Sequence, residues 1–150
     1  MTKINRELVT ILRDGVDFEL ICPFRFYFDT HSKNIKDLPS GILECEAENG
    51  GRFSVDIFIE IPKGFKTDFG SVPLAFQSFI SPVGKPTKAY VLHDYLCTLS
   101  NKGEIPRKVA DCVFLDAMKI LKVGVVRRYV IYGGVRAFAL FKSLKRRMNG

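Results

Sequence analysis

The hydrophobic pattern of this 150-residue chain changes once, near residue 85, from the period of a β-strand to that of an α-helix. In residues 52–61, every second residue from Phe53 to Ile61 is apolar, which predicts a strand with one buried face. The preceding Asn49-Gly50-Gly51 favours a tight hairpin, because Asn and Gly tolerate positive φ angles. We therefore expect residues 41–48 to pair with residues 52–61.

From Thr87 onward, apolar residues recur at helical spacing. Asn101-Lys102-Gly103 predicts the end of a first helix, Pro106 suits the first turn of a second, and residues 125–147 predict a third. The short connection makes the first two helices an antiparallel pair. We predict a single α+β domain over residues 1–150, in which an N-terminal antiparallel β-sheet or hairpin (β-rich residues 1–80) packs against three C-terminal helices (residues 86–148).

The net charge of +7 belongs to the third helix, because residues 124–150 hold seven basic residues and no acid. Its uncharged face, through Val126, Val130, Gly133, Ala137, Leu140 and Leu144, either packs on the core or lies in a membrane interface. A positive field attracts anionic partners. An anionic membrane is the expected partner, and nucleic acid is less favoured because no base-reading motif is present. The residues expected to bind such a surface are Arg127, Arg128, Arg136, Lys145, Arg146 and Arg147.

No apolar segment has the length expected of a signal peptide or a transmembrane helix, so we expect a cytoplasmic protein. The four cysteines are widely spaced and form no C-x-x-C pair, which predicts free thiols in a reducing compartment.

The candidate site centres on His93-Asp94 in the first long helix, since His is the natural base near neutral pH and Asp is a hard oxygen ligand. A second cluster, Thr67–Pro73, places short side-chain oxygens beside Gly70. These oxygens can bind a cation, or they can accept hydrogen bonds from loop amides and cap the short helix that follows. Asp111, near the start of the second helix, faces either His93 or the dipole of its own helix. Asp116 is expected to be solvated.

The segment Ile61–Pro73, with its T-D-x-x-S-x-P motif, and the segment Ala89–Leu96, with V-L-H-D-Y, resemble the signature of a phage and prophage domain of unknown function. Residues 110–136 continue the resemblance. It implies a viral or prophage origin, located in the host cell or the virion. It points to a site made of Asp68, Ser71, His93, Asp94 and Asp111.

The H-D pair is also similar to that of calcium-dependent phospholipases, which use H-D-x-x-Y on one helix and an Asp on an antiparallel partner. This resemblance implies that His93 activates water, Asp94 binds calcium and Asp111 orients His93. Two departures are present: Cys97 stands at the Tyr position, and the glycine-rich calcium loop does not precede His93.

Two functions follow from these patterns. One is a metal-assisted hydrolase of a lipid or cell-envelope ester, with His93 and Asp111 catalytic, Asp68 and Asp94 binding a divalent cation (calcium first), and Thr67, Ser71 and Tyr95 completing the site. The other is a non-catalytic virion, tail-assembly or host-interaction protein that binds other phage proteins and whose motif residues are structural.

Overall fold

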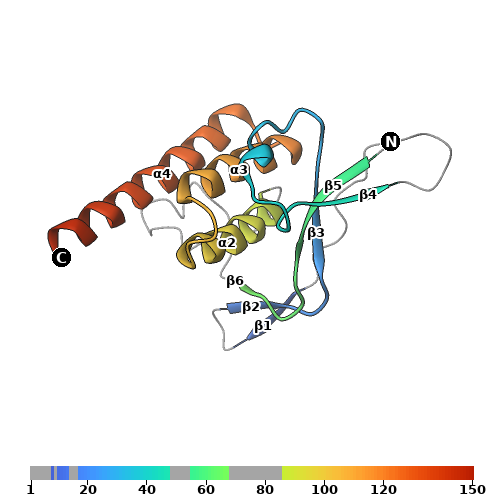
Figure 1. Cartoon of the computed structure of the whole chain (residues 1–150), viewed down its shortest axis with the longest axis horizontal. Coiled ribbons are helices and arrows are strands. Elements are labelled where there is room, and N and C mark those ends of the chain that lie inside the picture. The colour runs from blue at the N-terminus through green and yellow to red at the C-terminus, as the bar shows by residue number, and fades with distance from the viewer. Residues whose placement is uncertain (1–7, 9, 14–16, 48–54, 68–85) are drawn as a thin grey trace.

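The computed structural model describes residues 8, 10–13, 17–47, 55–67 and 86–150 of the chain. Its N-terminal half forms two three-stranded antiparallel sheets (Figure 1). The first has the order β1-β2-β6, with β1 at Thr10–Arg13, β2 at Asp17–Leu20 and β6 at Lys66–Thr67. The second has the order β3-β5-β4, with β3 at Phe24–Phe28, β5 at Val55–Ile61 and β4 at Glu44–Ala47.

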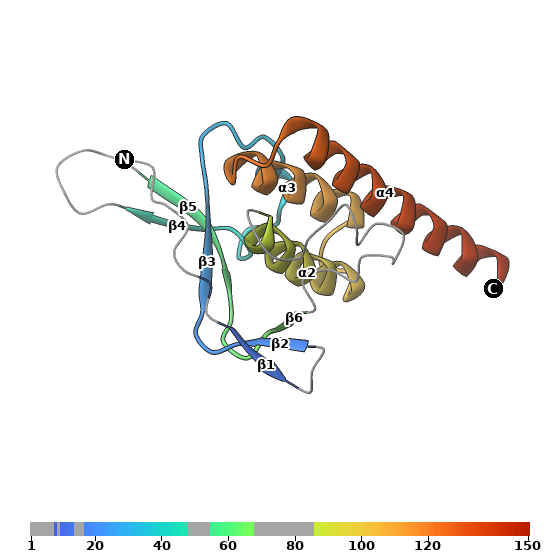
Figure 2. The ribbon, with the colours of Figure 1, turned by 180° about the vertical axis from the view of Figure 1, so that it is seen from behind.

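The C-terminal half holds three helices: α2 (Thr87–Asn101), α3 (Arg107–Ile120) and α4 (Val125–Met148). The middle helix, α3, contacts both of the others, and a short 3₁₀ helix, η1 (Asn34–Asp37), packs on α3 (Figures 1 and 2). The second half of α4 extends beyond the other two helices in both views. The predicted α+β class and the three helices are therefore confirmed.

The expected hairpin is confirmed in its two strands, since Cys45 lies opposite Ile57 in the antiparallel pair of β4 and β5. Its turn, at residues 49–51, lies outside the described residues. We expected one N-terminal sheet, and the described residues form two. Pro23 separates β2 from β3 and has no N–H to donate to a ladder, and the two strands join different sheets.

Gly64 returns the chain from the second sheet to the first. Its φ angle of +84° lies in the left-handed region, which Gly adopts without a steric cost. The N–H of Gly64 donates to the carbonyl of Leu20 at 2.8 Å, and the N–H of Leu20 donates to the carbonyl of Phe65 at 3.0 Å. This turn sets β6 beside β2 and brings Thr67 to the flank of α2, which β6 contacts.

Buried apolar side chains from strands and helices form a shared core cluster. Phe26, Ile59 and Ile61 come from the second sheet, and Leu96 and Phe114 come from α2 and α3. At about 25 cal/mol per Å² of apolar surface, burial of each large side chain stabilises the fold by roughly 1.5–3 kcal/mol. The core thereby holds α2 and α3 in fixed register, on which the candidate site depends.

The uncharged face of α4 does not pack on the core, as one of the two predicted alternatives had it. Ile131 is the buried residue of this helix, whereas Val126, Val130, Leu140 and Leu144, from the face expected to reach the core, are exposed. Ile131 and Val135 lie on the opposite side of the helix and make the contact with the core. No helix among the described residues has both the length and the apolar character needed to cross a membrane.

Candidate functional site

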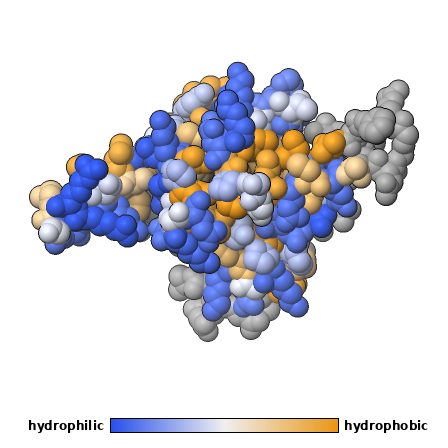
Figure 3. Space-filling model, in the orientation of Figure 1, coloured by the Kyte–Doolittle hydropathy of each residue, from blue (hydrophilic) through white to orange (hydrophobic). Residues whose placement is uncertain are grey.

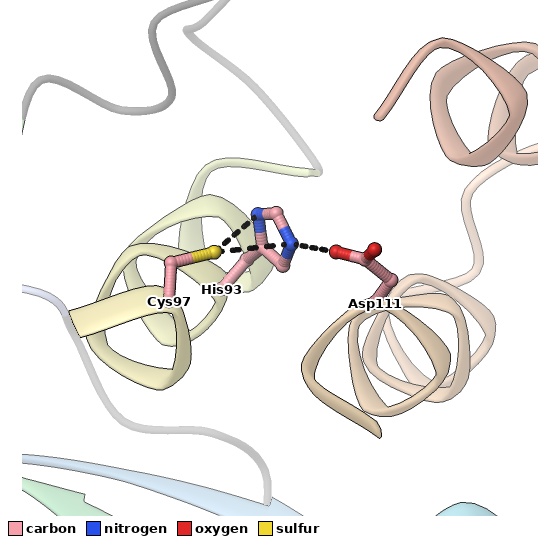
Figure 4. A group of neighbouring side chains, drawn as sticks. All are labelled: His93, Cys97 and Asp111. Atoms are coloured by element: carbon pink, nitrogen blue, oxygen red, sulfur yellow. Dashed lines mark hydrogen bonds and ion pairs between the residues drawn. The ribbon is translucent and has the colours of Figure 1, made fainter. Parts of the chain in front are cut away.

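The centre of the candidate site is a direct contact between His93 on α2 and Asp111 on α3 (Figure 4). The Nε2 atom of His93 lies 2.7 Å from Oδ1 of Asp111. Both residues are buried: Asp111 has no exposed surface and His93 is 6% exposed. The antiparallel packing of the two helices brings these residues together from 18 positions apart in the chain. Of the two orientations predicted for Asp111, the structure has the one that faces His93.

The Asp111 carboxylate is also held by two arginines. Arg107, one helical turn earlier on α3, donates through Nε to Oδ1 at 3.0 Å. Arg136 on α4 donates through an Nη atom to Oδ2 at 2.7 Å. Burial alone would raise the pKa of Asp111, but the hydrogen bonds from His93 and Arg136 outweigh it, and the pKa lies below the ordinary value. Asp111 is therefore an anion at neutral pH.

The imidazole of His93 stacks on the ring of Phe114, with ring centroids 4.4 Å apart. Burial lowers the pKa of His93, although Asp111 acts in the opposite direction, so the ring is neutral at neutral pH. A neutral imidazole has one N–H. Because Nε2 faces a carboxylate, the N–H is assigned to Nε2, which leaves the lone pair on Nδ1. His93 thus has the tautomer of a general base acting through Nδ1.

Cys97 is the polar neighbour of His93 on the same helix. Its Sγ lies 3.4 Å from Nε2 and 3.8 Å from Nδ1 of His93. Burial raises the pKa of the Cys97 thiol to about 12, so the sulfur stays protonated. A thiol in that state is a poor nucleophile, because the thiolate is the reactive form. The arrangement does not fit a cysteine nucleophile activated by His93.

His93, Cys97 and Asp111 also offer three ligand atoms within 4.8 Å of one another. The donor set does not fit a cation well. Both Asp111 oxygens already accept hydrogen bonds from arginines, and two guanidinium groups beside the carboxylate repel an added positive charge. The thiol would additionally have to lose its proton. We therefore do not assign a metal to this group.

Asp94, the second residue of the pair, points to the first sheet instead of to α3. The hydroxyl of Thr67 on β6 donates to Oδ2 of Asp94 at 2.5 Å. Adjacent helical residues diverge by about 100°, which explains why His93 and Asp94 reach different elements. Asp94 is half-buried. The other two predicted loop residues, Asp68 and Ser71, lie outside the described residues.

Two further residues of the predicted sets, Tyr95 and Arg136, lie among the described residues. Tyr95 packs edge-on against Phe65, with ring centroids 5.5 Å apart, on the side of α2 that faces β6. Arg136, assigned to a basic surface, is turned inward to Asp111 with 24% of its side chain exposed. The exposed members of the basic set are Arg127, Lys145, Arg146 and Arg147, and Arg128 is half-buried.

Two charged residues of α3 have partners that were not predicted from the sequence. Arg107 was not selected, although its i, i+4 spacing to Asp111 is the signal of a helical ion pair. Asp116 was expected to be solvated, and this is wrong: it is 4% exposed, and its Oδ2 accepts from the backbone N–H and the side-chain amide of Asn34 at 3.0 and 2.8 Å. The docking of η1 on α3, from 82 positions away, buries it.

Comparison with known proteins gives one family. The family model described as "Protein of unknown function (DUF1353)" matches residues 51–135, which is more than half of the chain and includes His93, Asp94 and Asp111. Neither the curated proteins nor the solved structures gave a match.

Proposed function

Because the chain belongs to the DUF1353 family of proteins of unknown function, we propose a function from its own geometry: it is a phage-type accessory hydrolase that cleaves an ester with a His-Asp dyad. The observation that supports this most is the 2.7 Å contact between Nε2 of His93 and Oδ1 of Asp111, which assigns the N–H to Nε2 and the lone pair to Nδ1, 3.8 Å from Sγ of Cys97. A general base needs a basic nitrogen, a fixed ring and a neutral form at working pH. His93 has all three.

In the proposed reaction, Nδ1 of His93 takes a proton from a water molecule while that water attacks the ester carbonyl. The ring then carries two N–H groups and a positive charge, which the buried Asp111 anion stabilises through Nε2. Collapse of the tetrahedral intermediate breaks the bond between the carbonyl carbon and the alcohol oxygen. The leaving alcohol takes the proton from Nδ1, so the products are an acid and an alcohol and His93 is neutral again.

A divalent cation is the cofactor that fits Asp94. Its carboxylate is a hard oxygen donor, which suits calcium or magnesium, and the hydrogen bond from Thr67 fixes its orientation. Calcium takes six to eight oxygen ligands, so Asp94 would be one of several, with Asp68 the next candidate from the sequence. Because Asp94 points toward β6 and His93 toward α3, such an ion would polarise the carbonyl only of a substrate that reaches both side chains.

A lipid or cell-envelope ester is the substrate class that we favour. The dyad lies between α2 and α3, and Arg136 connects it to the basic helix α4. A basic surface beside the site favours anionic substrates such as phospholipids. We place the protein in the infected host cell or in the virion.

The test is hydrolysis of a panel of phospholipid and short-chain esters by the purified full chain, with calcium and with a chelator. The key variant is His93→Gln, because the Gln amide can still donate to Asp111 but has no basic nitrogen. We expect the turnover of the active substrate to fall at least about 100-fold, the lower range for a general base. Asp94→Asn should weaken calcium binding, measured by calorimetry.

The matched control is His31→Gln, which changes the other histidine of the chain, an exposed residue. It should retain the activity of the unsubstituted protein. Equal activity of the His93→Gln and His31→Gln variants, or no turnover of any ester in the panel by the unsubstituted protein, would contradict the hydrolase proposal.

A second candidate function is that of a non-catalytic phage assembly or host-interaction protein. The observation that favours it is that the buried Asp111 carboxylate is held by one histidine and two arginines, from all three helices. In that case His93→Gln would lower the free energy of unfolding and the chain would bind neither calcium nor ester. Ester turnover and calcium binding by the unsubstituted chain distinguish the two functions.

A further inference from the structure

The fourth helix has two parts with different surroundings. In its first half, Ile131 is buried, Tyr132 and Val135 pack on the core, and Arg136 pairs with Asp111. From Phe138 onward the side chains are exposed, apart from the half-buried Ala139. This second half extends past α2 and α3 into solvent (Figures 1 and 2).

Large apolar side chains occupy one face of α4 and are exposed to solvent. Phe141 is 67% exposed and Met148 is 84% exposed. With 3.6 residues per turn, six of the exposed apolar side chains fall within roughly 100° of the helix circumference, whereas the exposed Val125 and Phe138 lie outside this arc. Figure 3 shows hydrophobic residues beside hydrophilic ones at the projecting end of α4. The six large members of this apolar face are Val126, Val130, Leu140, Phe141, Leu144 and Met148.

Basic residues border this face. Helical geometry sets Arg127 and Lys145 along one edge and Arg147 along the other. Residues 124–150 contain no acid, so nothing in this segment neutralises the basic groups. Arg136 is excluded from this surface because it binds Asp111. An apolar stripe with basic edges is the pattern of helices that lie in the interface of an anionic membrane.

Charge distinguishes the possible occupants of the apolar face. A second copy of this chain would bring two such basic helices together, with repulsion between like charges. A nucleic acid would satisfy the basic residues but would leave Phe141, Leu144 and Met148 in water, since phosphate contacts supply most of that binding. An anionic lipid surface satisfies both features: head groups pair with the basic edges and acyl chains cover the apolar face.

We propose that α4 is an interfacial helix that binds the surface of an anionic membrane through its apolar face and its basic edges. The helix lies parallel to the membrane, with Phe141 and Leu144 at the boundary between head groups and acyl chains. This proposal does not depend on the hydrolase, since it rests on a surface that contains no member of the His-Asp dyad.

Vesicle flotation with the full chain tests it, with phosphatidylcholine vesicles that contain or lack phosphatidylglycerol. We expect binding to the anionic vesicles, and weaker binding as salt is raised. Lys145→Gln with Arg147→Gln should weaken binding roughly 30-fold, about fivefold for each charge. Phe141→Ser with Leu144→Ser should weaken it at least about tenfold through the loss of apolar burial.

The matched control is Val55→Ser on β5, which removes an exposed apolar side chain far from α4 in the chain and should leave binding unchanged. His93→Gln should also bind vesicles normally, which separates this proposal from the hydrolase. Absence of vesicle binding, or equal binding to neutral and anionic vesicles, would overturn the proposal. So would a dimer of the unsubstituted chain in light scattering that Phe141→Ser converts to a monomer without any vesicle binding.

Discussion

Arg136 on α4 donates to the fully buried carboxylate of Asp111 on α3 at 2.7 Å, and this ion pair joins the basic helix to the helical pair that carries His93. The same carboxylate accepts from His93 and Arg107. Removal of one charge from a buried group of this kind leaves the others without a partner, which costs more than the pair itself contributes.

Asp111→Asn should therefore lower the free energy of unfolding by roughly 3–5 kcal/mol, since two arginines lose their counter-ion. Urea denaturation followed by circular dichroism measures this loss. Asp37→Asn, at an exposed acid of η1, is the control and should change the stability little. Equal stabilities of the two variants would show that the Asp111 cluster contributes nothing to the fold.

Stability should depend on pH through His93. Its pKa in the folded protein is lower than the 6.5 of a free imidazole, so below pH of about 6.5 the unfolded chain binds more protons. We expect the free energy of unfolding to fall as the pH decreases from about 6.5 toward the folded pKa. His93→Gln should remove this part of the pH dependence in urea titrations. An unchanged slope would contradict the burial of a neutral imidazole.

Asp111 should affect the free energy of unfolding at lower pH than His93 does. Its pKa is depressed in the folded protein, so its contribution is fully present above the unfolded value of about 3.8 and is lost as the pH falls through the folded pKa. Acid unfolding curves of the unsubstituted chain should show this loss below a pH of about 3.8, and Asp111→Asn should not show it.

Tyr90→Phe should not destabilise the protein. The Tyr90 hydroxyl is buried with no hydrogen-bond partner among the described residues, and burial raises its pKa to about 12. Removal of an unpaired buried hydroxyl relieves a desolvation cost, so we expect a gain of up to about 1 kcal/mol in thermal unfolding. Tyr90→Leu, which also removes the ring contact with Phe114, should instead be destabilising. A loss above about 1 kcal/mol for Tyr90→Phe would reveal a missing partner.

Asp116→Ala should detach η1 from α3. The variant leaves the half-buried backbone N–H of Asn34 without its acceptor and leaves the Asn34 amide with only the Cys112 carbonyl, so we expect a loss of roughly 1–3 kcal/mol. Lys119→Ala, which removes the exposed ion-pair partner of the same carboxylate, should be close to neutral. Chemical denaturation of both variants checks this, and similar effects would assign the role of Asp116 to the ion pair.

The helices and the hairpin strands could be predicted because local signals define them. Asn101-Lys102-Gly103 and Pro106 mark helix ends, and α2 and α3 end and begin beside them. The helical spacing and the antiparallel pair left two orientations open for Asp111, one toward His93 and one toward the dipole of its own helix. The resemblance to calcium-dependent phospholipases favoured the contact with His93 that the structure has.

The orientation of α4 could not be predicted, because the helix has apolar residues on two opposite sides. Ile131 and Val135 are as apolar as Val130 and Leu144, and only the fit to α3 decides which side is buried. The burial of Asp116 also depends on a distant segment, since η1 supplies its partner Asn34. Local pattern carries no information about such long-range docking.

The two halves of α4 are subject to different constraints on their sequence. Ile131 and Arg136 connect the helix to the fold, whereas the residues after Ala137 have almost no buried neighbours to satisfy. Substitutions there leave the melting temperature nearly constant, because they change neither core packing nor buried charge. Relatives of this protein are thus free to diverge in that tail, and whatever is retained there reports on an external requirement instead of on folding.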